Sequence, residues 1–464
     1  MRLYRFGYQF LTLFYGLGLK IASLFSHKAK LWVQGRHNWR EKLTQGLNAA
    51  NHNSKPIIWL HAASLGEYEQ GKMLLQKYKS ENSGYFILVS FFSPSGYEII
   101  SRQQRANGQH LIDYCCYLPL DTAKNARDFI QIANPALIIW VKYEFWYYYL
   151  HTAAEKKIPI YLIGVIFSPL HIIFSFWGKL TWQMMNFFTK IFTQDSESAE
   201  IVSNFLQKQP KDNFYQQHNF YDKIHPAGDT RIDSIAQHNQ QRQHLPIIEN
   251  FIGDNLPAKS PVFIVGSSHG EDLPHLAHIL PPLWDKGWKI ILVPHEIDPK
   301  SIEKTVAFLN NLNSSPLLYS SLENSPLTTQ HSPTSHHSPP TSHHSLIIDK
   351  IGLLKYAYQY ADFAYIGGGF SGGVHNVLEA AVFGLPTAFG GVLHKFIELK
   401  QLIKLNAAFH IQPTADNMPQ NWLSFIQNSQ QTAQKNQIKQ TLAHFFAQHQ
   451  GATDKIYNLI NEKE

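Results

Sequence analysis

The sequence predicts an α/β protein of two Rossmann-like domains that face each other across a cleft, preceded by an N-terminal membrane-associated helix. Apolar, β-rich runs alternate with helical patterns in two successive series, which is typical of parallel sheets covered by helices on both faces. A polar stretch at 205–260 separates the two series. In the second series, five glycines follow an apolar run within residues 363–386, which indicates a strand, a glycine loop and a helix start.

Residues 1–30 are predicted to form the membrane-associated helix. The stretch 4–25 is apolar and aromatic, but its uninterrupted part, Phe10–Leu19, is shorter than the roughly 20 residues of a spanning helix. Basic residues lie within and around it, at Arg2, Arg5, Lys20, Lys28, Lys30, Arg36 and Arg40. We therefore expect a helix that lies on, or dips into, an anionic membrane face. A helix buried in the core is the alternative.

The first series predicts a domain over residues 31–225. Strands are expected at Ile57–His61, Tyr85–Phe91, Ala136–Val141, Ile158–Ile163 and Lys190–Thr193, with helices near 67–80, 95–106, 122–133 and 144–156. The chain has two cysteines, Cys115 and Cys116, which are adjacent. This excludes a disulfide framework and indicates a reducing compartment.

The second series predicts a domain over residues 226–464. Its strands are expected at Val262–Gly266, Lys289–Pro294, Ser345–Asp349 and Phe363–Ile366, followed by helices in 420–464. An insert at 328–345, TTQHSPTSHHSPPTSHHS, interrupts this domain. Its Ser, Thr, Pro and His content predicts disorder, with metal capture by its five histidines as the alternative.

Four turns of the second series are expected at one edge of its sheet, because the carboxyl ends of parallel strands meet there. They are GSSHGED (266–272), PHEID (294–298), IGLL (351–354) and the glycine loop. Their polar and flexible residues suit a phosphate, and the predicted contacts are Ser267, Ser268, His269, Gly368, Gly369, Ser371 and Gly372. Glu379, one turn inside the next helix, can accept hydrogen bonds from a ribose. Each turn alone fits an ordinary βα connection, but together they predict a nucleotide pocket.

Three segments supply candidate catalytic side chains. Glu67, after IIWLHAASLG, opens a helix whose dipole favours its anion, so that it could act as general base toward an alcohol. Lys142 and Glu144 follow a strand, at the ligand-binding edge of its sheet. Arg231, in GDTRID, could hold a carboxylate or phosphate by two parallel hydrogen bonds. The alternatives are a plain helix-start glutamate, a solvated ion pair and a surface arginine.

The net charge and the absence of certain motifs make several classes of function less plausible. The net charge of +6, without a long Lys/Arg run, favours an anionic ligand or surface and argues against nucleic acid as a partner. No GxGxxG follows the first strand, which disfavours a dinucleotide-dependent dehydrogenase. No Asp-x-Asp pair occurs, although metal-dependent nucleotide-sugar transferases use such carboxylates. We expect neither a cofactor nor a metal.

The motifs HAASLGE, EFW, GDTRID, GSSHGED, PHEID and GGGFSGGVHNVLEAA resemble, in this order, those of the bacterial 3-deoxy-D-manno-octulosonic acid (Kdo) transferases. The resemblance implies a GT-B glycosyltransferase with an acceptor-binding first domain and a CMP-sugar-binding second domain. It implies inverting transfer of Kdo from CMP-Kdo to the lipid A precursor (lipid IVA), in lipopolysaccharide biosynthesis. The implied location is the cytoplasmic face of the inner membrane.

The resemblance also implies roles for residues at matching positions. Glu67 stands at the position of the catalytic base, and Arg231 at that of a residue, usually Lys, that assists the departing phosphate. The positions that contact CMP are Pro294, His295, Ile351, Gly352, Leu353, Asn376, Val377, Leu378 and Glu379.

The chain departs from the family pattern in several places. Lys142 replaces the first carboxylate of a Glu-x-Glu pair, so that Lys142 acts differently or Glu144 takes over. The segment Ile351–Leu354 lacks the carboxylate of the family's Met-Gly-Glu-Leu. The rival functions are another nucleotide-sugar enzyme, such as a lipid glycosyltransferase or an epimerase, and a non-catalytic membrane sensor of nucleotide sugars.

Overall fold

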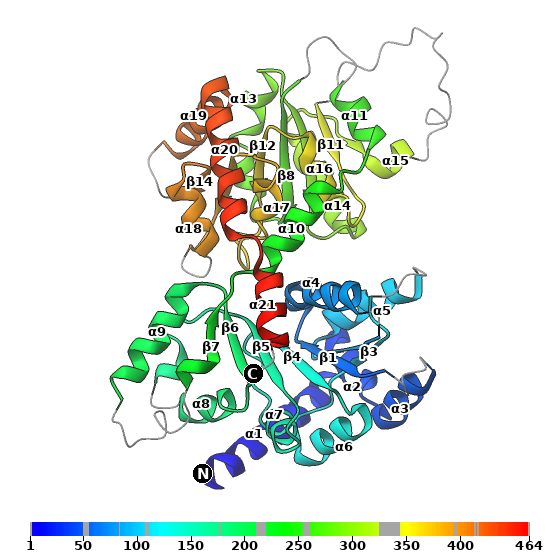
Figure 1. Ribbon diagram of the computed structural model, residues 1–464. Coiled ribbons are helices and arrows are strands. Elements are labelled where there is room, and N and C mark those ends of the chain that lie inside the picture. The colour runs from blue at the N-terminus through cyan, green and yellow to red at the C-terminus, as the bar shows by residue number, and fades with distance from the viewer. Residues whose placement is uncertain are drawn as a thin grey trace. The chain divides into compact units, whose positions relative to one another are not determined.

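The computed structural model describes residues 2–49, 55–82, 84–106, 111–175, 178–209, 220–253, 260–323, 344–393, 397–412, 414 and 417–462. The chain divides into two compact units. Unit 1 comprises Met1–Ser234 and His449–Glu464, and unit 2 comprises Ile235–Gln448. Each unit contains a parallel sheet with helices on both of its faces (Figure 1), so the prediction of two Rossmann-like α/β domains is confirmed.

Unit 1 has a seven-stranded parallel sheet in the order β3-β2-β1-β4-β5-β6-β7. Its strands are β1 (Ile57–Ala62), β2 (Phe86–Phe91), β3 (Tyr114–Tyr117), β4 (Leu137–Val141), β5 (Ile160–Val165), β6 (Lys190–Thr193) and β7 (Ile224–Pro226). Its helices are α1 (Arg2–Ala22), α2 (His27–Gly35), α3 (Trp39–Ala49), α4 (Leu65–Glu81), α5 (Pro94–Ala106), α6 (Ala123–Ala133), α7 (Tyr147–Glu155), α8 (Lys179–Met185), α9 (Ser196–Gln207) and α21 (Ala452–Asn461). Helix α10 (Thr230–Gln240) crosses the boundary between the units.

The central strands of unit 1 are apolar except for His61 of β1 and Ser90 of β2, because both faces of the sheet are covered. Every residue of β1 is buried. Side chains of a strand alternate between its faces, and accordingly Ile57 and Trp59 belong to one core cluster whereas Ile58 and Leu60 belong to the other.

Unit 2 repeats this architecture with the strand order β10-β11-β9-β8-β12-β13-β14. Its strands are β8 (Val262–Ser268), β9 (Lys289–Pro294), β10 (Leu317–Leu318), β11 (Ser345–Ile347), β12 (Phe363–Ile366), β13 (Thr387–Gly390) and β14 (Ala408–Ile411). Its helices are α11 (Pro246–Ile252), α12 (Leu273–Leu276), α13 (Leu280–Trp284), α14 (Pro299–Asn311), α15 (Tyr319–Glu323), α16 (Leu354–Ala357), α17 (Leu378–Ala381), α18 (Ile397–Lys404), α19 (Met418–Gln430) and α20 (Thr432–His449).

Each parallel sheet has a topological switch point, where the chain has added strands on one side of the first strand and continues on its other side; it lies between β1 and β4 in unit 1 and between β8 and β12 in unit 2. The connections on the two sides of such a point lie on opposite faces of the sheet, which leaves a crevice outside the carboxyl ends of the strands. Glu67, Lys142 and Glu144 follow these strands in unit 1, and His269 and the glycine loop follow them in unit 2.

The C-terminal helix differs from the predicted domain assignment, which placed 226–464 together. Helix α21 packs on α4 of unit 1, where Tyr457 contacts Tyr78 with ring centroids 4.8 Å apart. Asp233 fixes its start by accepting hydrogen bonds from the Gly451 and Thr453 amides, each at 2.7 Å. Because of these contacts, the C-terminal helix belongs to unit 1 and not to unit 2.

Several predicted elements differ in their limits. Helix α7 begins at Tyr147 rather than 144, because Lys142 has a left-handed φ of 58° and the chain turns before the helix. Ser345 ends the predicted insert and begins a predicted strand, Ser345–Asp349; it is the first residue of β11, which ends at Ile347. Of the insert, only His344 and Ser345 are among the described residues. The other insert positions lie outside them, including His331, His336, His337 and His343.

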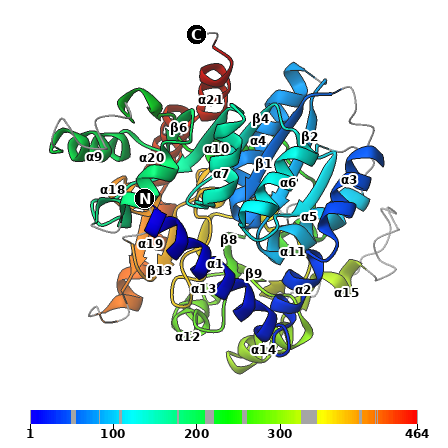
Figure 2. The ribbon, with the colours of Figure 1, turned by 90° about the horizontal axis from the view of Figure 1, so that it is seen from below.

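Helix α1 is held against unit 1 along one side. The Tyr8 hydroxyl donates to the Asp121 carboxylate at 2.5 Å, and this carboxylate also accepts from the Tyr148 and Tyr149 amides at the start of α7. Burial raises the pKa of Asp121 to about 6. Figure 2 shows α1 running from the N-terminus to α2.

The other side of α1 and the turn after it expose large apolar side chains, at Phe10, Leu11, Leu13, Phe14, Leu17, Ile21, Leu24 and Phe25. Among the described helices, none combines the length and the hydropathy needed to cross a membrane. An exposed apolar face of this extent marks a surface for a membrane or another partner.

Candidate active site

In unit 1, Glu67, Lys142 and Glu144 lie at the crevice between β1 and β4. Glu67 is in the first turn of α4, where its Oε2 accepts a hydrogen bond from the Ala63 amide at 2.5 Å. Lys142 follows β4 directly, and its amide donates to the Ile163 carbonyl of β5 at 2.9 Å. Three of the predicted catalytic side chains are therefore brought together by the fold.

The pKa of Glu67 is raised to about 7, chiefly because burial disfavours the carboxylate. The hydrogen bond from Ala63 and the Lys142 cation oppose this rise, and the negative charge of Glu144 adds to it. Glu67 thus exchanges its proton near neutral pH, as a general acid or base requires.

The sequence reasoning passed over His61, the buried residue near the end of β1. The Ser90 hydroxyl accepts from Trp59 Nε1 at 2.8 Å and lies 2.9 Å from His61 Nδ1, so it can give its own hydrogen to Nδ1. The imidazole proton is then on Nε2, which lies 4.0 Å from Glu144 Oε2. The signal available in the sequence was a histidine ending an otherwise apolar strand.

Arg231 lies in the first turn of α10, within unit 1. Its guanidinium forms a bidentate ion pair with Asp229, with Nη2 2.6 Å from Oδ2 and Nε 3.1 Å from Oδ1. The predicted bidentate geometry is present, but the partner is a carboxylate two residues away. The role of Arg231 toward a phosphate stays a prediction.

In unit 2, the glycine loop and the turn after β8 are joined through Asp272. This buried carboxylate accepts hydrogen bonds from the Gly368 amide at 3.0 Å, the His269 amide at 2.7 Å and the Tyr365 hydroxyl at 2.6 Å. Gly367 lies so close to this turn that a Cβ would be 2.4 Å from the Ser267 carbonyl. Glycine at this position is a packing requirement.

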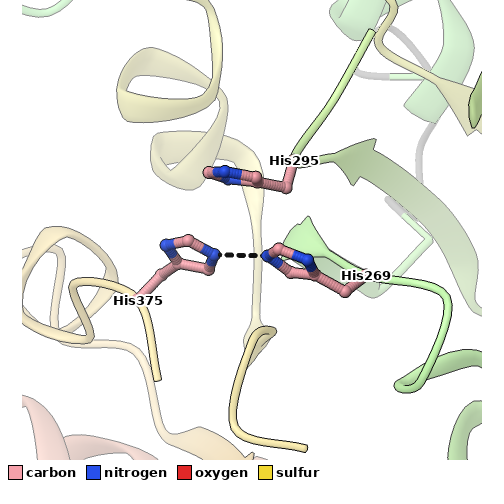
Figure 3. A group of neighbouring side chains, drawn as sticks. All are labelled: His269, His295 and His375. Atoms are coloured by element: carbon pink, nitrogen blue, oxygen red, sulfur yellow. Dashed lines mark hydrogen bonds between the residues drawn. The ribbon is translucent and has the colours of Figure 1, made fainter. Parts of the chain in front are cut away.

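Three imidazoles gather beside this junction (Figure 3). His269, His295 and His375 follow β8, β9 and β12, and Nε2 of His269 lies 2.8 Å from Nε2 of His375. Burial lowers the pKa of His375 to about 4 and also lowers the pKa of His295, and each neighbouring imidazole adds to the effect. Sequence analysis named His269 and His295 but missed His375.

The other predicted nucleotide contacts surround the same crevice. A cavity of about 270 Å³ is lined by Ser268, His269, Pro294 and His295, together with Lys304 and the start of α14. Ile351 is 86% exposed and Gly352 has a φ of 87°.

The residues after the glycine loop form a tight turn rather than a long helix. Helix α17 has four residues, so Glu379 is its second residue and not one turn inside it. Asn376 accepts from the Leu378 amide at 3.2 Å and donates to Glu379 at 3.3 Å, which fixes the carboxylate. Burial raises the pKa of Tyr358, which follows α16, and the Glu379 charge adds to the rise, so these two turns are neighbours. Val377 and Leu378 are buried, backbone included, and the Leu378 amide is already bonded to Asn376.

Comparisons with known proteins agree on family and fold. Residues 37–215 match the family model described as 3-deoxy-D-manno-octulosonic-acid transferase (kdotransferase). The chain is 25% identical to a 3-deoxy-D-manno-octulosonic acid transferase of Chlamydia trachomatis serovar D, over 73% of this chain and 71% of that protein. It is 23% identical to one of Rickettsia typhi, over 94% and 85%. The UDP-GlcNAc 2-epimerase of Neisseria meningitidis bound to UDP-GlcNAc shares the fold, with a TM-score of 0.55, 12% identity and 88% and 98% coverage.

Proposed function

We propose that this relative of the Kdo transferases is itself an inverting glycosyltransferase that moves Kdo from CMP-Kdo to the lipid A precursor, lipid IVA, in lipopolysaccharide biosynthesis. The observation that supports it best is Glu67, a carboxylate at the crevice of a Rossmann-like sheet with a pKa of about 7. The relatedness to Kdo transferases supports the choice of sugar.

In this reaction Glu67 takes the proton of an acceptor hydroxyl as its oxygen bonds to the anomeric carbon of Kdo. The bond from that carbon to the phosphate oxygen breaks, and CMP leaves with the electron pair. Lys142 favours the ionised form of Glu67, since its cation lowers the pKa of that carboxyl. Arg231 would stabilise the departing phosphate after exchanging its pairing with Asp229.

Unit 2 would bind the nucleotide through the turns that follow β8, β9 and β12 and the turn before α16. The fixed carboxylate of Glu379 suits a ribose diol, and the polar cavity beside His269 and His295 suits the phosphate. We propose that transfer needs no metal, because a monophosphate leaving group gathers less negative charge than a diphosphate.

Incubation of the protein with CMP-Kdo and lipid IVA, followed by mass spectrometry of the lipid, tests the proposal directly. Addition of one or more Kdo units is expected, including in the presence of EDTA. A lipid that stays free of Kdo, combined with tighter binding of UDP than of CMP, would instead favour an epimerase or another nucleotide-sugar enzyme.

We also propose that the protein works at the cytoplasmic face of the inner membrane, held there by α1. The exposed apolar face of α1 supports this, and so does an apolar cavity of about 730 Å³ between α1, α2 and α3. Lys20, His37 and Lys42 also line that cavity, and their amines and imidazole suit the phosphates of an anionic lipid.

Replacing both Leu24 and Phe25 by serine is expected to weaken binding to phosphatidylglycerol vesicles about tenfold or more. These side chains are 77% and 87% exposed, and burying one large apolar side chain in a membrane contributes about 1.5–3 kcal/mol. Co-sedimentation measures the effect. Leu170→Ser is the matched control, since Leu170 is 96% exposed but lies outside α1 and the turn after it. Equal losses in both variants would contradict the assignment of α1 and the turn after it as the membrane contact.

A further inference from the structure

The three imidazoles of unit 2 are the one group of described histidine, cysteine, aspartate or glutamate side chains whose ligand atoms converge as a metal site requires. One ring nitrogen of each of His269, His295 and His375 lies within 4.8 Å of those of the other two. The rings are stacked, with centroids 4.4 Å apart between His295 and His375 and 4.5 Å apart between His269 and His295. Figure 3 shows the facing nitrogens of His269 and His375.

The backbone holds each histidine in place independently of the rings. The His269 amide donates to Asp272, the His295 amide to the Ser268 carbonyl at 2.9 Å, and the His375 amide to the Gly367 carbonyl at 3.1 Å. A Cβ on Gly368 would lie 2.8 Å from the His375 ring, so glycine makes room for it. The three Cα positions are thus set by the sheet and by Asp272, whereas the rings can still rotate.

We propose that His269, His295 and His375 form a binding site for a divalent zinc ion. The Nε2 atoms of His269 and His375 lie 2.8 Å apart, a hydrogen-bond distance that requires one of the two nitrogens to carry a proton. An ion in place of that proton requires zinc–nitrogen distances of about 2.0–2.1 Å, which place the nitrogens of a tetrahedral site about 3.3 Å apart. The nitrogens therefore move apart by about half an ångström, and His295 turns its ring toward the same point.

The chemistry of the three imidazole ligands determines which metal ions the site prefers. Three imidazole nitrogens with no thiolate favour zinc and its neighbours over magnesium or calcium, which prefer oxygen. Three protein ligands leave a fourth tetrahedral position for water or for an oxygen of a bound anion. Because the cavity lined by His269 and His295 is also the proposed phosphate site, a bound ion would lie where the nucleotide phosphate enters. The metal site itself does not depend on the proposed transferase activity.

Cobalt(II) is the probe, since it replaces zinc and gives visible d–d absorption in tetrahedral sites. The test uses untagged full-length protein in which the five histidines of the insert, His331, His336, His337, His343 and His344, are replaced by serine, so that they cannot contribute ligands. We expect one cobalt ion per chain, visible absorption, and displacement by zinc.

His269→Ala, His295→Ala and His375→Ala, each in that background, should weaken cobalt binding at least tenfold and remove the visible band. His444→Ala, an exposed histidine on α20, is the matched control and should leave both unchanged. Circular dichroism confirms that each variant is folded. A background protein that binds no cobalt, or a folded His375→Ala variant that binds it as tightly as the background, would overturn the proposal.

Discussion

Glu67→Gln is expected to lower kcat for Kdo transfer about 10³-fold, within the range of 10²–10⁴ that general-base catalysis contributes. Glutamine can still accept the hydrogen bond from Ala63, so the loop keeps its shape, but it cannot take a proton. CMP affinity should stay unchanged, because Glu67 is in unit 1 and the turns proposed to bind the nucleotide are in unit 2. Turnover of CMP-Kdo and calorimetric CMP binding measure the two quantities.

Glu69→Gln is the matched control on the same helix, since Glu69 pairs with Lys72 at 3.4 Å and is given no catalytic role. It should keep near-normal kcat. Near-normal transfer by a folded Glu67→Gln protein would remove Glu67 from the mechanism.

The pKa of about 7 for Glu67 also predicts how activity and stability change with pH. The activity kcat/KM should rise with pH and level off above about 7, as the carboxylate forms. Stability follows the opposite course. The folded state holds the proton more tightly than the unfolded chain, whose carboxyl has a pKa of 4.5, so stability is lost as pH rises from 4.5 to about 7. Glu67→Gln should therefore be the more stable protein at pH 8, by on the order of 2 kcal/mol.

Asp272→Ala is expected to lower the free energy of unfolding of unit 2 by about 3–5 kcal/mol, a larger loss than the one expected for Tyr365→Phe. The substitution leaves two buried amides and one buried hydroxyl without an acceptor, and each unsatisfied group costs about 1–3 kcal/mol. The melting transition of unit 2 should fall by roughly 10 °C. Hydrogen exchange in peptides covering 266–272 and 366–376 should accelerate.

Tyr365→Phe is the graded comparison, because it removes one donor from Asp272 but leaves both amides bound. Its loss should be about 1 kcal/mol. Unchanged exchange in Asp272→Ala would contradict the view that this carboxylate joins the glycine loop to the turn after β8.

The sequence predicted the central strands of both sheets well, because the residue pattern that indicates each strand lies within the strand itself. Fully buried parallel strands are apolar in nearly every position, so β1, β2, β4, β8, β9 and β12 could each be found, within about two residues. The short edge strand β10, the interrupted turn at Lys142 and the four-residue helix α17 were missed or misplaced. Their limits depend on neighbouring strands and on single left-handed residues, which a pattern of apolar residues does not encode.

By itself, the sequence determined the fold class, the order of the candidate catalytic and nucleotide motifs and the resemblance to Kdo transferases. Tertiary structure alone decided which of these residues interact: Glu67 with Lys142 and Glu144, Arg231 with Asp229, and His375 with His269 and His295. The reason is physical. Whether a strand or turn forms depends mainly on nearby residues, whereas a pKa, an ion pair or a metal site depends on distances between side chains that the sheet brings together from remote parts of the chain.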